Sequence, residues 1–247
     1  MAEQQATPEF SKWAMGYSGC DGGDLGSPQS PSIWVCGIEW GGGDIDGQWL
    51  KEQLISDASE PGYGYDTPEI NLSYTFNRQT TKLLCAINGI AVESYEDFAR
   101  KEKPFVKSQK GYFKMNLYPL SFKNTGDDLW KSWLHELTGF SNKKEYMEWC
   151  KKNRFIFLSD IKRKHKPRLI ICFGRTYKDD FKSAFCEKDT EERKEKILDR
   201  ELIWYRSDST IVAVCPFPTG PHGLNSNILL QEFGKRISSL LESKSVS

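Results

Sequence analysis

Three polar elements of this sequence each follow a run of apolar residues. A polar side chain just beyond such a run could take part in chemistry. Glu39 follows residues 33–38, Asn116 follows residues 113–115, and a loop rich in Pro and Gly at 219–227 follows residues 211–215. A carboxylate can orient a water molecule, and an asparagine amide can donate and accept hydrogen bonds side by side. A loop before a helix offers backbone donors to an anion. Each residue alone could cap a turn or face solvent, but their common position after a strand favours a functional site.

The elements around these residues predict one α/β domain. Short apolar runs bounded by turn formers predict strands at 33–38, 113–117, 169–173 and 211–215. Amphipathic helices are expected at 48–56, 74–87, 95–100, 127–140, 143–161, after Gly174 and at 228–242, and 187–200 is expected to be a solvated helix or loop. Because strands alternate with helices, we predict a three-layer α/β/α domain with a mostly parallel central sheet over residues 1–247, frayed at 1–12. Glu39 and Asn116 should then open on one cleft beyond the carboxyl ends of the strands.

Composition restricts the class of protein. Lys plus Arg equals Asp plus Glu at 34 each, so any attraction to nucleic acid must come from a local patch. The sequence shows neither a signal peptide nor an apolar run of about 18 residues, so we expect a soluble, cytoplasmic monomer without a membrane partner. Its seven cysteines include no C-x-x-C pair, which predicts buried free thiols and no metal site.

Several short motifs occur in an order that resembles the uracil-DNA glycosylase superfamily. They read G-I-E-W-G at 37–41, N-L-Y-P-L at 116–120, R-L-I-I-C-F-G-R at 168–175 and V-C-P-F-P-T-G at 214–220. The similarity is scattered over residues 33–240, and the order and spacing of the motifs carry it. The resemblance implies the superfamily's fold and a monofunctional DNA glycosylase that needs no cofactor.

The resemblance also implies roles for individual residues. Glu39 falls where the superfamily's Asp or Asn handles the attacking water. The N-L-Y-P-L segment is similar to the base-reading strand of the single-strand-selective monofunctional branch and places Asn116 at the pyrimidine edge. Phe76 precedes Leu83 and Leu84 by the spacing of an aromatic residue that stacks on the base. Further substrate contacts are expected from Trp40, Gly41 and Thr219.

Contact with single- or double-stranded DNA requires a wedge and a phosphate-binding surface. A base must leave the stack to reach such a site, and Leu224 is expected to fill the gap, with Asn225 beside it. The basic runs at 162–168 and 100–114 are candidates for phosphate contact, Lys164 and Arg168 among them. A solvated helix end would explain the first run equally well.

Departures from the superfamily's motifs point to an altered substrate. Trp40 stands where a proline is usual, Glu39 is one methylene longer than Asp, and Phe217 occupies the position of a catalytic histidine. His222, five residues on, is the candidate replacement, and Asp44 or Asp46 would be the next acids to test. With the glycines at 41–43 and at 62 and 64, these departures suggest a modified pyrimidine, as in superfamily members that act on phage DNA in phage defence.

Two other classes of protein remain open from the sequence. A catalytically inert nucleic-acid-binding module on the same fold would explain the altered motifs, and it predicts binding without base release. A nucleotide-binding Rossmann-like enzyme would use the glycine loops for phosphate, but neither G-x-G-x-x-G nor the P-loop pattern occurs.

Overall fold

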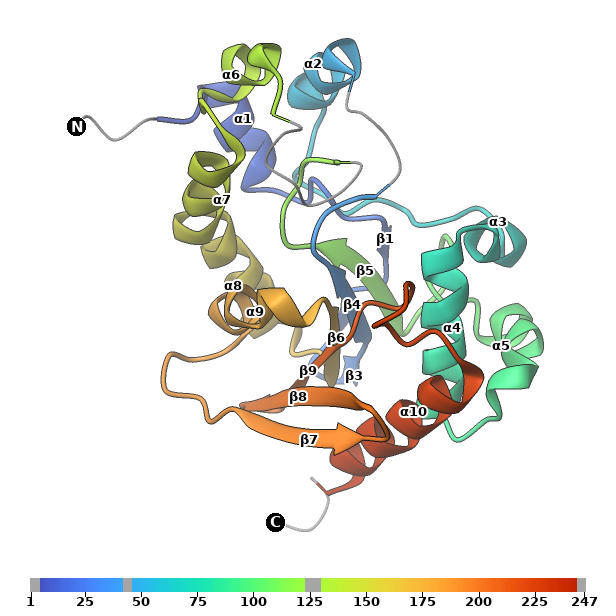
Figure 1. Cartoon of the computed structure of the whole chain (residues 1–247). Helices are drawn as coiled ribbons and strands as arrows, with labels where there is room; N and C mark the ends of the chain where they lie inside the picture. The colour runs from blue at the N-terminus through green and yellow to red at the C-terminus, as the bar shows by residue number, and fades with distance from the viewer. Residues whose placement is uncertain (1–4, 42–45, 123–129, 244–247) are drawn as a thin grey trace.

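The computed structural model describes residues 5–41, 46–122 and 130–243, and its centre is a mixed seven-stranded sheet (Figure 1). The strand order is β1-β5-β4-β6-β9-β8-β7. In that order the bounds are Gly22–Gly23, Tyr112–Asn116, Ile33–Gly37, Leu169–Phe173, Thr210–Cys215, Arg200–Ser207 and Arg193–Ile197. The short strands β2 (Gly26–Ser27) and β3 (Ser30–Pro31) form a separate hairpin.

The four central strands are parallel neighbours, as the sequence predicts. β4 pairs with β5 on one side and with β6 on the other, and β6 pairs with β9, all in parallel. Every residue of these four strands is buried, which explains their nearly continuous apolar sequences. Gly37 pairs with Asn116, so Glu39 and Asn116 lie at the same end of the sheet, beyond or at the carboxyl ends of their strands.

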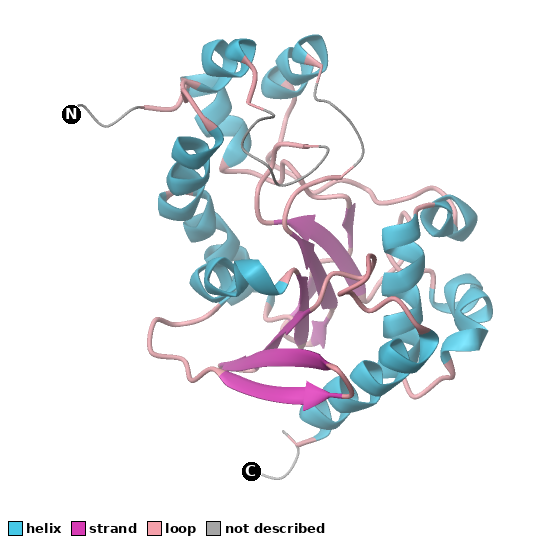
Figure 2. Ribbon diagram, viewed as in Figure 1, coloured by secondary structure: helices cyan, strands magenta, loops and turns pink. Residues whose placement is uncertain are grey.

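Helices cover both faces of the sheet (Figure 2). On one face lie α3 (Pro68–Ser73), α4 (Thr75–Ile87), α5 (Tyr95–Glu102) and α10 (Asn227–Glu242), and on the other lie α1 (Pro8–Ala14), α7 (Lys143–Lys152), α8 (Arg154–His165) and α9 (Lys178–Phe185). α2 (Gly47–Ile55) and α6 (Ser132–Thr138) pack beside α1 at the end where β4 and β5 finish. The α/β class with a largely parallel centre is therefore as predicted.

Alternation along the strands divides the apolar core into two clusters. Ile33 and Val35 of β4 contact the cluster under α4 and α10, whereas Trp34 and Cys36 contact the cluster under α7 and α8. Each such side chain is wholly buried and contributes about 1.5–3 kcal/mol of burial free energy. All seven cysteines are free thiols, and all but Cys186 are buried, in agreement with the sequence-based expectation.

Three local predictions were wrong. The helix expected at 143–161 is two helices, because Asn153 departs from helical geometry between α7 and α8. Part of the charged stretch at 187–200 is strand β7, which tolerates charge because it lies at the sheet edge. Phe10 and Trp13 are buried in α1, so the chain is packed from Pro8 onward rather than frayed to residue 12.

Candidate active site

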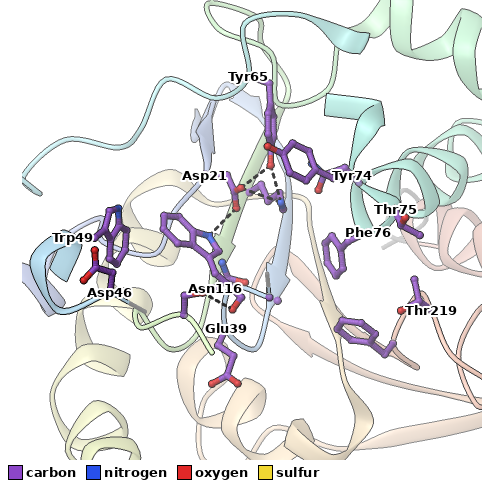
Figure 3. A pocket seen from close by; sticks show the side chains of 17 residues that line it. Asp21, Glu39, Asp46, Trp49, Tyr65, Tyr74, Thr75, Phe76, Asn116 and Thr219 are labelled. Carbon is purple, nitrogen blue, oxygen red and sulfur yellow. Dashed lines mark hydrogen bonds and ion pairs between the residues drawn. The ribbon is translucent and has the colours of Figure 1, made fainter. Parts of the chain in front are cut away.

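A cavity of about 920 Å³ opens beyond the carboxyl ends of β4 and β5 (Figure 3). Its size lies near the upper end of the range of about 300–1,000 Å³ that is usual for ligand sites. Six side chains or backbone positions predicted from the sequence line it: Glu39, Trp40, Gly41, Phe76, Asn116 and Thr219. The structure therefore brings the predicted acid, amide and aromatic ring together.

Glu39 is held in a buried ion pair. It lies two residues beyond the end of β4, and its side chain is 7% exposed. The Nζ of Lys143, the first residue of α7, is 3.1 Å from each of its carboxylate oxygens. Lys143 is fully buried and lies 4.2 Å from the centre of the Phe122 ring. The sequence analysis did not find this partner.

Burial changes the acidity of Glu39. It raises the pKa of the Glu39 carboxyl to about 7, and the adjacent Lys143 ammonium opposes that rise. The carboxyl therefore changes charge close to neutral pH, which is the range in which a general base is most effective.

Asn116, the last residue of β5, presents a fixed amide. Its Nδ2 donates to the carbonyl oxygen of Gly19 at 3.0 Å, and because a carbonyl only accepts, this bond sets the orientation of the amide. Oδ1 accepts no hydrogen bond from the residues that the structure describes and packs against Gly37. A Cβ at position 37 would lie 2.3 Å from Oδ1, so the close approach requires glycine there. Asn116 thus offers an acceptor in a set direction at the cavity wall.

Aromatic rings form the opposite wall of the cavity. Phe76 is the second residue of α4 and packs edge-on against Phe173 with ring centres 5.4 Å apart. Phe217 lies 5.6 Å from Phe76 between ring centres and is 43% exposed. Tyr74 also lines the cavity and is 56% exposed. The residue at the superfamily's histidine position is therefore part of an aromatic wall.

A polar cluster that the sequence analysis missed lies in the same cavity. The Lys114 ammonium is 3.1 Å from Asp21 Oδ1 and 3.1 Å from the Tyr65 hydroxyl. Tyr65 donates to Asp21 Oδ1 at 2.7 Å, and Trp40 Nε1 donates to Asp21 Oδ2 at 3.3 Å. Burial and the Asp21 carboxylate raise the pKa of Tyr65, which keeps its hydroxyl protonated. A lysine inside the buried strand β5 is unusual and could have been the signal for this cluster.

The loop after β9 does not supply the predicted catalytic and wedge residues. His222 is exposed and does not line the cavity. Leu224 is wholly buried in the cluster under α4 and α10, so its prediction as a wedge between bases is wrong. Asn225 is exposed, and its Nδ2 donates within the loop to the Gly220 carbonyl at 3.0 Å.

Lys164 and Arg168 lie away from the cavity. Arg168 immediately precedes β6, and Lys164 is at the end of α8, so both are at the amino end of the parallel strands. The cavity lies at the carboxyl end, so the structure does not bring these two predicted DNA contacts to it. Lys162, in the same run, is buried and donates to the Ser207 hydroxyl at 2.8 Å.

Two further predictions concern the loops. Asp46 lines the cavity but also caps α2 by accepting from Gln48 N at 3.0 Å, whereas Asp44 lies outside the described residues. Gly64 has φ of 85°, and a Cβ there would lie 2.2 Å from the Phe105 carbonyl oxygen. Loop packing therefore explains this glycine, and it is not an adaptation to a larger base.

No protein-family model matches the chain, and no curated protein matches it. Among the described helices, none is both long enough and apolar enough to cross a membrane. Within the described ranges no three His, Cys, Asp or Glu side chains gather as a metal site. The function must therefore be inferred from the geometry of the cavity.

Proposed function

We propose that this protein is a monofunctional DNA glycosylase that releases a modified pyrimidine from DNA and leaves an abasic site. The observation that carries the proposal is the meeting of Glu39, Asn116 and Phe76 in one cavity at the carboxyl edge of the parallel strands. These are the acid, the base-reading amide and the stacking ring that the superfamily resemblance implies. The fold proposed is correspondingly of the uracil-DNA glycosylase type, and the setting proposed is repair or phage defence in the cytoplasm.

The reaction follows from where charge develops. The bond between C1′ of the deoxyribose and the base nitrogen breaks with its electron pair on the base, and the sugar passes through an oxocarbenium-like state. The Glu39 carboxylate stabilises that cation and accepts a proton from the water that bonds to C1′. The departing base takes up a proton from solvent. With a pKa of about 7, Glu39 is ionised in a large fraction of molecules at neutral pH.

Recognition of the base uses the fixed amide and the aromatic wall. Asn116 Oδ1 accepts from a ring N–H or an exocyclic amino group of the pyrimidine. Phe76 stacks on the ring. Because Leu224 is buried, the exposed rings of Tyr74 and Phe217 at the cavity replace it as contacts for unstacked bases.

Release of free base tests this proposal. Oligonucleotides that carry uracil, 5-hydroxymethyluracil, hypoxanthine, 5-hydroxymethylcytosine or its glucosylated form, in duplex and single strands, would be incubated with the protein and then treated with alkali to cleave abasic sites. We expect cleavage at a modified pyrimidine in preference to uracil. Efficient release from uracil alone would contradict the substrate class, and no release from any substrate would contradict the activity.

A second candidate function is an inert DNA-binding module. The observation that favours it is that both Glu39 oxygens lie 3.1 Å from Lys143, which restrains the acid. In addition, no histidine is among the described residues that line the cavity. This candidate predicts tight binding of the same oligonucleotides with no abasic sites formed.

A further inference from the structure

The cavity has a second polar region, separate from Glu39. In Figure 3 the Glu39 carboxylate points away from Asp21 and Tyr65, and Asn116 lies between them. The second region consists of Asp21, Tyr65 and Lys114, and we call it the Asp21 cluster. The side chains of Lys114 and Asp21 are only 10% and 15% exposed, and both line the cavity. A ligand that occupies the cavity can therefore reach a nearly buried pair of opposite charges.

Hydrogen-bonding capacity beside the Asp21 cluster is unused. Asn77 lines the cavity and is 1% exposed, and neither its Oδ1 nor its Nδ2 has a hydrogen-bond partner among the described residues. Asn77 also approaches the Tyr65 hydroxyl in a hydrogen-bond-like contact that lowers the pKa of Tyr65, an effect smaller than those of burial and Asp21, but this contact falls short of hydrogen-bond geometry. A buried amide without partners destabilises the folded protein, and at the wall of a cavity a bound ligand can supply the missing partners.

We propose that the Asp21 cluster and Asn77 bind a neutral, hydroxyl-bearing substituent on the base, such as a hydroxymethyl group or a sugar attached to one. This inference rests on the proposed function, since it assumes that Asn116 and Phe76 hold the pyrimidine ring. Hydroxyl groups can donate to Asp21 or Asn77 Oδ1 and accept from Lys114 or Asn77 Nδ2. The site can therefore both accept a hydrogen bond from a hydroxyl group and donate one to it.

Charge and size favour a neutral substituent larger than a methyl group. The acids Asp21, Glu39 and Asp46 line the cavity against the single lining lysine, Lys114, among the described residues. Lys114 is paired with Asp21, and Lys143 behind the lining is paired with Glu39. A carboxylate or phosphate on the base would therefore meet lysines that acids already engage, which disfavours it. The volume of about 920 Å³ also leaves room beside a stacked pyrimidine.

The test compares matched substrates with two variants and a control. Asn77→Leu removes both unpartnered atoms while keeping the branched shape of the side chain, and Asp21→Asn removes the charge at the same size. Thr81→Val is the control, because Thr81 Oγ1 is also buried without a partner on α4 but does not line the cavity. Single-turnover release and affinity would be measured for DNA carrying cytosine, 5-hydroxymethylcytosine, glucosylated 5-hydroxymethylcytosine or 5-carboxylcytosine.

Wild type and the control should prefer the hydroxyl-bearing bases over cytosine and 5-carboxylcytosine. Asn77→Leu and Asp21→Asn should each lower that preference about 10- to 100-fold. Equal loss on all substrates, or equal use of 5-carboxylcytosine, would overturn the inference. If wild type binds hydroxyl-bearing DNA selectively but releases no base, the glycosylase proposal fails and the subsite stands. Asn77→Leu should also melt no lower than wild type, which separates a lost contact from a lost fold.

Discussion

Lys143→Met should unfold more easily than wild type at pH 8, because it leaves the carboxylate of Glu39 buried without its ammonium. Lys143 is fully buried and Glu39 is 7% exposed, so water replaces little of the lost charge. Removing one partner of such a pair costs about 3–5 kcal/mol. For a chain of this length each kcal/mol corresponds to about 2–4 °C, so the melting temperature should fall by about 6–20 °C.

The double variant Glu39→Gln/Lys143→Met separates this effect from catalysis. It removes both charges, so at pH 8 it should be at least as stable as wild type. Burial raises the Glu39 pKa from 4.5 to about 7, so the folded state prefers the protonated acid. That preference stabilises wild type fully below pH 4.5 and is lost as pH rises through 7. Wild type should therefore lose on the order of 3 kcal/mol relative to the double variant over this interval.

Urea unfolding at pH 5 and pH 8, with single-turnover base release on the same preparations, measures both quantities. The double variant should release base about 10²–10⁴ times more slowly than wild type. Equal stability of Lys143→Met and the double variant at pH 8 would refute the buried pair. Base release by the double variant at the wild-type rate would refute the role of Glu39 in activating water.

Three further predictions concern the pH profile, the base-reading amide and the DNA-binding surface. In wild type, kcat/KM should rise as pH increases through about 7, the pKa of Glu39. Lys143→Met should move the midpoint of this rise about 1–3 pH units higher, because the ammonium that opposes the raised pKa is gone. A profile that falls with rising pH would exclude Glu39 as the base. Gly37→Ala places a Cβ 2.3 Å from Asn116 Oδ1, which displaces the amide that accepts from the base. The affinity for the base should therefore weaken by about 1–3 kcal/mol while the circular dichroism spectrum stays unchanged. Unaltered affinity would show that Asn116 does not read the base. Replacing Lys164 and Arg168 by Ala should leave DNA affinity and its salt dependence unchanged, since both residues lie at the far end of the sheet from the cavity. If the slope of log affinity against log salt concentration fell by about one per replaced residue, DNA would contact that end instead.

The sequence predicts the strands and the cavity edge well, for a physical reason. A parallel strand buried on both faces must be apolar almost throughout, so residues 33–38 and 169–173 are recognisable without any structure. Once the strands are known, the carboxyl edge follows, and Glu39 and Asn116 must lie close together. The charged strand β7 escapes prediction because an edge strand pairs through its backbone and tolerates polar side chains.

Partners that are distant in sequence could not be predicted. Lys143 is 104 positions from Glu39, and Asp21 is 93 positions from Lys114. Lys114 is marked by its place in an apolar strand, but nothing local identifies Asp21 as its partner. Lys143 stands in a charged segment that resembles a solvated helix start. The burial of Leu224 could not be predicted either. The sequence around a leucine in a polar loop does not show whether its side chain projects outward or packs under a helix. Only packing decides between the two.

Hydrolysis of the bond between a modified pyrimidine and its sugar in this cavity must release free base and abasic sites in equal amounts, so a mass balance measures it. A duplex with one 5-hydroxymethylpyrimidine would be incubated with wild-type protein, the free base quantified by mass spectrometry, and abasic sites counted with an aldehyde-reactive probe. We expect one intact free base per abasic site, with no strand break before alkali. Stable DNA binding with neither product, from a protein with a normal unfolding transition, would contradict it.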